Sequence, residues 1–215
     1  MRVDRCFAFI DLSGFTAFTD RHGDERVVVV LAELRTALRE AAARRGVRVV
    51  KWLGDGAMLS STMTDAVSAL VVEIDHRMRT AIPSLAVRAG LDCGPVIMFE
   101  GDDYIGRCVN LASRLCDQAG SHEILATEPV MARRPAWIDA EECQPRLVRG
   151  LEHPVAVTTL SLSEPGSDPI TDPVCQLPIA RAHAVRGEDD QWFCSEACAG
   201  TWRERPGDHG LTTAI

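Results

Sequence analysis

The chain has 215 residues, of which 46% are apolar and 25% are charged, and its formal net charge is −8. This length and composition are those of a globular protein with one medium-sized domain and room for a small appendage, and the acidic balance argues against nucleic acid as a partner. No apolar run approaches the roughly 18 residues of a membrane span and no signal peptide is visible, so we expect a cytoplasmic protein without membrane contact, whose eight cysteines are thiols or metal ligands rather than disulfides.

Strands and helices are predicted to alternate along the first three quarters of the chain. In order, the pattern favours a strand at 6–10, a turn at 11–14 that leads into a helix, a long helical stretch at 27–45, strands at 47–53 and 57–61, a helix at 64–80, strands at 85–93 and 96–99, a helix at 109–118, a strand at 123–126, a short helix near Pro129, and strands near Leu147 and at 155–160. Gly54-Asp55-Gly56 indicates a hairpin between two of the strands. The mixture predicts an α+β fold with a mixed, mainly antiparallel sheet.

Two carboxylates stand where strands are expected to end. Asp11 follows the first predicted strand, and Asp55 lies in the hairpin turn. A pair of this kind can hold hard cations such as Mg²⁺ or Mn²⁺ and leave positions open for phosphates. Taken alone, Asp11 could equally be a helix cap and Asp55 a turn residue.

Lys51 is the one lysine among the 23 lysine and arginine residues. A compact ammonium can serve where a guanidinium cannot, although an ordinary strand lysine is the simpler interpretation. Further along, Asn110 and Arg114 are four residues apart and share one face of a predicted helix. An arginine beside a neutral donor suits a phosphoryl centre, but a surface ion pair and a local cap remain open as alternatives.

The last fifty residues differ in character from the rest. A linker-like segment at 163–171 leads into a region with Cys175, Cys194 and Cys198. A segment this small usually needs a disulfide or a bound metal ion to fold, and in the cytosol a metal ion is expected. Cys194 and Cys198 would point the same way on a helix, and His183 is a candidate fourth ligand. The alternative is three unrelated buried cysteines.

Several motifs in a row resemble the class III nucleotidyl cyclases over about residues 5–162. They are FIDLSGFT at 9–16, KWLGDG at 51–56, VRAGLDCGPV at 87–96, DYIG through VNLASR at 103–114, and LVRGL with PV at 147–155. The resemblance implies the ferredoxin-like fold of that family, with a catalytic domain at 1–162. The segment at 98–102 is shorter than the arm that many relatives use to clasp a partner.

The resemblance also implies a role for each matched residue. Asp11 and Asp55 would bind two Mg²⁺ or Mn²⁺ ions, and Lys51 with Asp103 would read the purine of ATP. Asn110 would orient the ribose, and Arg114 would neutralise charge at the α-phosphate. In this family the site lies between two domains, so a head-to-tail homodimer is expected to make cyclic AMP. The alternatives are a guanylyl cyclase, which Lys51 and Asp103 argue against, and a cyclase-like metal sensor that binds nucleotide without turnover.

The cysteine-rich segment at 172–215 resembles the YHS/TRASH family of small metal-binding modules. The resemblance lies in DPVC at 172–175 and in WFCSEAC at 192–198. It implies Zn²⁺ or Cu⁺ bound by Cys175, Cys194 and Cys198. His183 corresponds to the family's central histidine, although it lies closer to Cys175 than is usual. The expected function is therefore an adenylyl cyclase with a metal-binding tail that tunes it.

Overall fold

The computed structural model describes residues 2–99 and 103–204 of the chain. It divides into two compact units, with the boundary between Ser163 and Glu164. The boundary lies near the end expected for the first domain at residue 162, and the segment expected as a linker is not wholly extended chain. Its last residues, Pro169–Thr171, form a strand of the second unit.

The first unit is built around a mixed, mainly antiparallel sheet, as predicted. In chain order its elements are β1 (Arg2–Ser13), α1 (Phe15–Arg45), β2 (Arg48–Leu53), β3 (Gly56–Ser61), α2 (Thr64–Ala81), β4 (Ala86–Phe99), β5 (Asp103–Ile105), α3 (Arg107–Gln118), β6 (Ile124–Ala126), α4 (Glu128–Met131), β7 (Ile138–Glu142) and β8 (Thr158–Leu162). The strand order is β2-β3-β1-β4-β6-β8-β7, with β5 paired to β4. Only the β4–β6 pair is parallel among those described.

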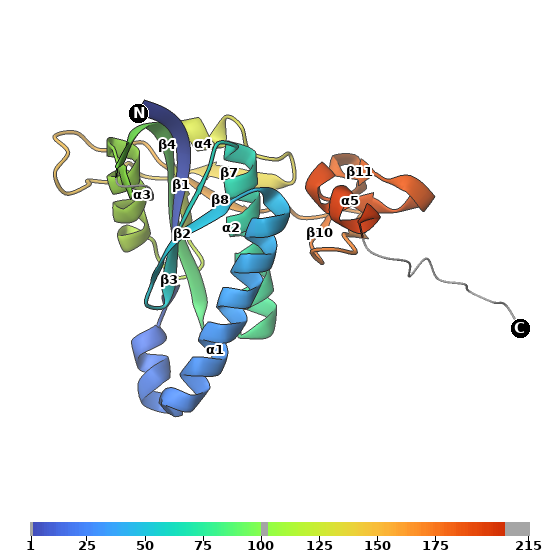
Figure 1. Cartoon of the computed structure of the whole chain (residues 1–215), viewed down its shortest axis with the longest axis horizontal. Coiled ribbons are helices and arrows are strands. Elements are labelled where there is room, and N and C mark those ends of the chain that lie inside the picture. Colours follow the sequence, from blue (N-terminus) through green and yellow to red (C-terminus); the bar gives the residue numbers. More distant parts are fainter. Residues whose placement is uncertain (1, 100–102, 205–215) are drawn as a thin grey trace, which may run out of the picture. The chain divides into compact units, whose positions relative to one another are not determined.

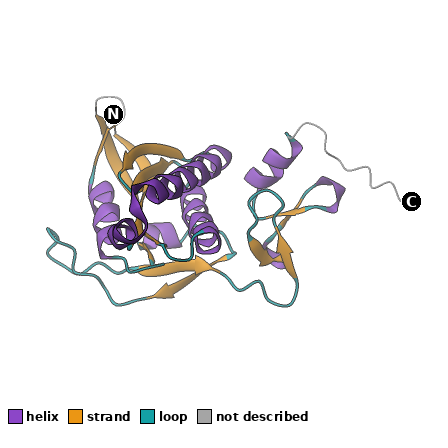
Figure 2. Cartoon of the chain, turned by 90° about the horizontal axis from the view of Figure 1, so that it is seen from below, coloured by secondary structure: helices purple, strands orange, loops and turns teal. Residues whose placement is uncertain are grey.

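The helices cover the two faces of the central strands. Figure 1 shows α1 and α2 on one side of β1 to β4 and α3 on the other, and Figure 2 shows the same layers turned by 90°. The alternating residues Cys6, Ala8, Ile10 and Leu12 of β1 are all buried, as is Phe7 on its other face, so β1 runs through the core. Within residues 2–99 and 103–204, no helix combines the length and the apolar character needed to cross a bilayer.

Several elements extend beyond the predicted bounds. Helix α1 begins at Phe15, directly after the predicted turn at 11–14, and runs on into the helical stretch predicted at 27–45, with a break at Gly23, which has φ 76°. Strand β4 continues through Gly94-Pro95 instead of turning there, because β1 pairs with it along its whole length. Strand β7 was not predicted from the sequence, and the strand expected near Leu147 is a single bridge between Arg146 and Val155. Residues 100–102 of the expected short arm lie outside the described residues.

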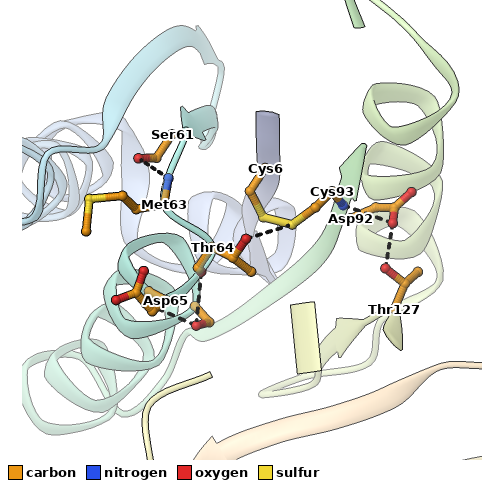
Figure 3. Close-up of a disulfide and its surroundings, with 9 residues drawn as sticks. Cys6, Ser61, Met63, Thr64, Asp65, Asp92, Cys93 and Thr127 are labelled. Atoms are coloured by element: carbon orange, nitrogen blue, oxygen red, sulfur yellow. Dashed lines mark hydrogen bonds between the residues drawn. A yellow bond between two sulfur atoms is a disulfide. The ribbon is translucent and has the colours of Figure 1, made fainter. Parts of the chain in front are cut away.

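A disulfide joins Cys6 to Cys93, which contradicts the expectation that every cysteine would be a thiol or a metal ligand. The two residues are partners in the antiparallel β1–β4 register, with their Cα atoms 4.0 Å apart. Directly opposed cysteines on neighbouring strands lie within reach of each other, and a one-dimensional pattern does not reveal that register. Figure 3 shows the bond beside Thr64, with Asp92 turned away to Thr127. Cys108, Cys116 and Cys143 are free, as expected.

In its described residues, 164–204, the second unit consists of short elements. They are β9 (Pro169–Thr171), β10 (Pro178–Ala180), the 3-10 turn η1 (Arg181–His183), β11 (Val185–Arg186), η2 (Glu188–Asp190), β12 (Trp192–Phe193) and α5 (Glu196–Arg203). β9 pairs with β10, and β11 pairs with β12. Its buried residues include Ile179, Phe193 and three cysteines, so sulfur atoms make up much of a very small core. Residues 205–215 of the predicted module lie outside the described part.

Candidate active site

The two carboxylates expected to bind divalent ions lie together. Asp11 is on β1, and Asp55 is in the tight turn between β2 and β3. Gly56 lets that turn approach, since a Cβ there would be 2.3 Å from the backbone oxygen of Ile10 and 3.1 Å from Oδ1 of Asp11. Burial raises the pKa of the Asp55 carboxyl above its ordinary value, and the negative charge of Asp11 raises it further. Two like charges held this close favour a cation between them.

Arg88 is a member of this site that the sequence reasoning missed. It is the partner of Asp11 in the β1–β4 register, and its Nε donates a hydrogen bond of 2.9 Å to Oδ2 of Asp11. That hydrogen bond raises the pKa of the Arg88 guanidinium. Oδ2 of Asp11 is therefore occupied, while Oδ1 faces the turn that carries Asp55. The available signal was an arginine within a mostly apolar strand, where a partly buried charge needs a partner.

Lys51 and Asp103, the residues expected to read the purine, form an ion pair with each other. Lys51 is on the edge strand β2, and Asp103 begins β5, which is paired to β4 through Phe99. The neighbouring Tyr104 packs edge-on against Phe7 at 5.2 Å, which holds β5 over the sheet face that carries Phe7. Both charged side chains remain about half exposed, at 47% and 53%, so the pair is accessible to a ligand.

Asn110 and Arg114 lie on α3, where the sequence placed them, and both are exposed. They line a cleft of about 270 Å³ whose other wall contains Arg149 and Gly150. Helix α3 sits close against β4 because Gly90 has no side chain; a Cβ there would lie 2.2 Å from a backbone oxygen of the helix. The helix cap interpretation of Asn110 is not supported, since no side chain caps α3 and Gly106 occupies the N-cap position.

Each group of residues in this site has donor or acceptor atoms that suit one kind of ligand. Asp11 and Asp55 offer hard oxygen donors, which fit Mg²⁺ or Mn²⁺. Asp11 is not a helix cap either, because α1 starts after Gly14 without a side-chain cap. Lys51 with Asp103 offers a donor and an acceptor side by side, and Arg114 offers a cation from an exposed helix face. By their chemistry, the two carboxylates suit a divalent cation, the Lys51–Asp103 pair suits a polar ring, and Arg114 suits an anionic group.

A second site lies within the small unit. Asp172, Cys175, Cys194 and Cys198 are buried, and their ligand atoms all lie within 4.8 Å of one another. The Sγ atom of Cys194 is 3.6 Å from that of Cys175 and 3.6 Å from that of Cys198. Tetrahedral Zn²⁺ with bonds of about 2.3 Å needs sulfur atoms about 3.8 Å apart, so the cluster fits such an ion.

The fourth member of this cluster is Asp172, whereas His183, the fourth ligand expected from the sequence, lies outside it. His183 lies exposed in η1, outside the group. Asp172 is fully buried, and its carboxylate accepts hydrogen bonds from the backbone N–H groups of Val174, Cys175 and Cys194, at 2.7, 3.1 and 2.7 Å. It therefore joins the two cysteine-bearing segments. Sequence reasoning missed it because the search for a fourth ligand favoured histidine.

Comparison with known proteins identifies one matching family model and several related sequences. A model of the "Adenylate and Guanylate cyclase catalytic domain" matches residues 4–155. An uncharacterised protein of Mycobacterium tuberculosis is 37% identical over 148 residues, which is 68% of this chain and 38% of that protein. Adenylate cyclase 2 of Rhizobium meliloti is 28% identical over 198 residues, covering 80% of this chain and 54% of that protein. The chain thus spans about half or less of the length of these curated relatives.

Solved structures share the fold. The adenylyl cyclase CyaB from P. aeruginosa aligns with a TM-score of 0.64 and 24% identity, over 76% of this chain and 96% of that one. The guanylate cyclase domain of RhGC from Catenaria anguillulae aligns with a TM-score of 0.67 and 18% identity, over 76% of this chain and 100% of that one. Both confirm the predicted class III fold. The chain therefore belongs to the adenylate and guanylate cyclase catalytic-domain family.

Proposed function

We propose that the protein is an adenylyl cyclase that converts ATP into 3′,5′-cyclic AMP and pyrophosphate. The observation that carries the proposal is the pairing of Lys51 with Asp103, which presents a donor and an acceptor together, on a chain that also brings Asp11 beside Asp55. The named adenylate cyclases among the relatives support it.

The adenine ring has a nitrogen that accepts a hydrogen bond beside an amine that donates one. Lys51 would donate to the ring nitrogen, and Asp103 would accept from the amine, so the ion pair would open around the base. Guanine presents a carbonyl in place of that amine, which leaves Asp103 facing an acceptor. A site that leaves a buried polar group unpaired discriminates by up to about 10⁴-fold, and the half-exposed pair here should give less.

Asp11 and Asp55 would hold two Mg²⁺ or Mn²⁺ ions, with Oδ1 of Asp11 facing Asp55 and Oδ2 held by Arg88. When bound, these ions would lower the pKa of the 3′-hydroxyl and neutralise charge on the phosphates. The 3′-oxygen bonds to the α-phosphorus, the bond from that phosphorus to the bridging oxygen of pyrophosphate breaks, and the hydroxyl proton leaves to solvent. Asn110 would orient the ribose, and Arg114 would stabilise the charge at the α-phosphate.

The assembly we propose is a head-to-tail homodimer with two sites. The metal carboxylates of each site come from one chain, and Lys51, Asp103, Asn110 and Arg114 come from its partner. The exposure of Asn110 and Arg114 on α3 supports this arrangement, because their side chains are available to a second chain.

The decisive experiment is to incubate the purified protein with Mn²⁺ and either ATP or GTP and to measure both cyclic products. We expect cyclic AMP to exceed cyclic GMP by at least about tenfold. Asp55→Ala is the inactive control, since it removes one metal ligand and leaves Lys51 and Asp103 in place. Cyclic GMP as the main product would favour the guanylyl cyclase alternative. Nucleotide binding without any product would favour the non-catalytic one.

We also propose that the small unit binds one thiophilic ion, Zn²⁺ or Cu⁺, through Cys175, Cys194 and Cys198, with Asp172 beside them. The sulfur spacing of 3.6 Å supports this second function. Metal analysis of the purified protein should give one ion per chain, lost in Cys198→Ser and kept in His183→Ala. Equal loss in both variants would restore His183 as a ligand. Comparing the cyclase activity of Cys198→Ser with that of the intact protein tests whether the tail tunes the enzyme.

A further inference from the structure

Helix α1 contacts the edge of the sheet through a stack of three side chains. The guanidinium carbons of Arg35 and Arg39 lie 5.2 and 5.1 Å from the ring centroid of Trp52, on β2. Arg35 and Arg39 are one helical turn apart, so both reach the same ring. β2 ends the strand order and, among the described strands, pairs only with β3; its register shifts between Val49 and Lys51. A bulged edge strand has few contacts of its own to hold its direction.

Arg35 makes a second contact that Arg39 lacks among the described residues. Its Nη2 donates a hydrogen bond of 3.3 Å to the backbone oxygen of Gly54. Gly54 has φ 66° and precedes Asp55 in the β2–β3 turn. One guanidinium therefore holds both the aromatic ring that follows Lys51 and the carbonyl that precedes Asp55.

Lys51 and Trp52 are consecutive on a strand, so their side chains point to opposite faces of the sheet. Trp52 faces α1, and Lys51 faces β5, where it meets Asp103. Any rotation of β2 about its own axis would move Lys51 away from Asp103. Any tilt of the turn would move Asp55 away from Asp11. Arg35 resists both movements, whereas Arg39 resists only the first.

We propose that Arg35 is a positioning residue that aligns the base-reading lysine and the metal-binding turn of one chain. The inference rests on the proposed function, because it takes Lys51 and Asp55 as the groups that hold the nucleotide and the ions. Arg35 itself need not touch either of them. It acts through Trp52 and Gly54.

The test compares Arg35→Met with Arg39→Met in the full-length protein. Each substitution removes one cation from the Trp52 ring, and only the first removes the hydrogen bond to Gly54. Mn²⁺ binding, followed by the loss of the free-ion electron paramagnetic resonance signal, needs no catalytic activity. We expect Arg35→Met to weaken Mn²⁺ binding by about tenfold, the effect of one lost charge-assisted hydrogen bond, and Arg39→Met by less than about twofold.

Cyclase kinetics give a second readout. Arg35→Met should lower kcat/KM for ATP by roughly 10- to 100-fold and reduce the preference for ATP over GTP, because both groups shift. Arg35→Lys keeps a cation and a donor, so it should recover part of the loss. Thermal midpoints report general damage to the fold, which would affect both Met variants alike. Should Arg35→Met be insoluble, Arg35→Gln takes its place in the same comparison.

Equal Mn²⁺ affinities in the two arginine variants would overturn the inference. That result differs from a failure of the proposed function, in which the unmodified protein makes no cyclic nucleotide. In that case the Mn²⁺ comparison would still decide whether Arg35 holds the turn. An unchanged ATP to GTP preference in Arg35→Met would leave Arg35 a role at the metal turn only, and would overturn its role in aligning Lys51.

Discussion

A site shared between two chains makes a quantitative prediction for mixtures of inactive variants. On the proposed function, Asp55→Ala would remove a metal ligand and Lys51→Ala would remove a base-reading group, so each homodimer should be inactive. In a mixed dimer, one site receives both defects and the other receives neither. Random exchange of equal amounts makes half of the dimers mixed, and each has one intact site of two, so about a quarter of the normal specific activity should return.

The structure supplies the matched control. Asp11 and Asp55 contact each other within one chain, and so do Lys51 and Asp103. Mixing Asp11→Ala with Asp55→Ala should therefore restore nothing, because every site in the mixed dimer still lacks one carboxylate. The same holds for Lys51→Ala mixed with Asp103→Ala.

The assay is cyclic AMP formed per milligram of protein at varied mixing ratios, with chain exchange followed by mass spectrometry under native conditions. Activity should be highest when the two variants are mixed in equal amounts and should be absent when only one variant is present. Absence of rescue in a sample that demonstrably contains mixed dimers would refute the shared site. Recovery of activity in either control mixture, of the two carboxylate variants or of the two base-reading variants, would refute the assignment of the residues to opposite chains.

Three further predictions follow from the contacts described. Burial raises the pKa of the Asp55 carboxyl, so its protonated form is favoured in the folded state and this contribution to stability is lost as the pH rises through the raised pKa. At neutral pH the ionised carboxylate therefore destabilises the fold. Asp55→Asn should raise the thermal midpoint of the metal-free protein at neutral pH while abolishing Mn²⁺ binding. Thiol titration of the unfolded, unreduced protein should find six thiols and not eight, since Cys6 is bonded to Cys93. Glu73→Gln should lower the free energy of unfolding by about 3–5 kcal/mol, because Glu73 is fully buried and pairs with Arg44, Arg45 and Arg77. Glu40→Gln, which affects only the exposed pair with Arg77, should cost less than about 0.5 kcal/mol by chemical denaturation.

The parts of the fold that sequence predicts well are those specified locally. The Gly54-Asp55-Gly56 turn, the apolar stripe of α1 and the helix carrying Asn110 and Arg114 each depend on residues close in the chain. The parts it missed depend on distant partners. Strand β4 passes through Pro95 only because β1 pairs along its full length, and β7 has an acidic, half-exposed sequence that reads as loop.

In the site too, the motifs identified residues with local signals and missed pairs that depend on distant partners. Asp11 and Asp55 were found from local signals, but the Arg88–Asp11 pair and the Cys6–Cys93 bond arise from one strand register that aligns residues 77 and 87 positions apart. No periodicity in a single strand encodes which residue of a neighbour stands opposite. A register of this kind becomes visible only when both strands are placed.

The arginine opposite Asp11 has a consequence for ion binding. Arg88 neutralises part of the charge that Asp11 and Asp55 share, so the metal-free site is less repulsive than two adjacent carboxylates alone would be. On the proposed function, an incoming divalent ion would bind at Oδ1 of Asp11 while the Arg88 guanidinium holds Oδ2, and the two cations would repel each other. A polyphosphate that contacts both relieves this repulsion, which makes tight ion binding depend on the nucleotide. Ion affinity should therefore be weak in the free protein and strengthen when the triphosphate is present.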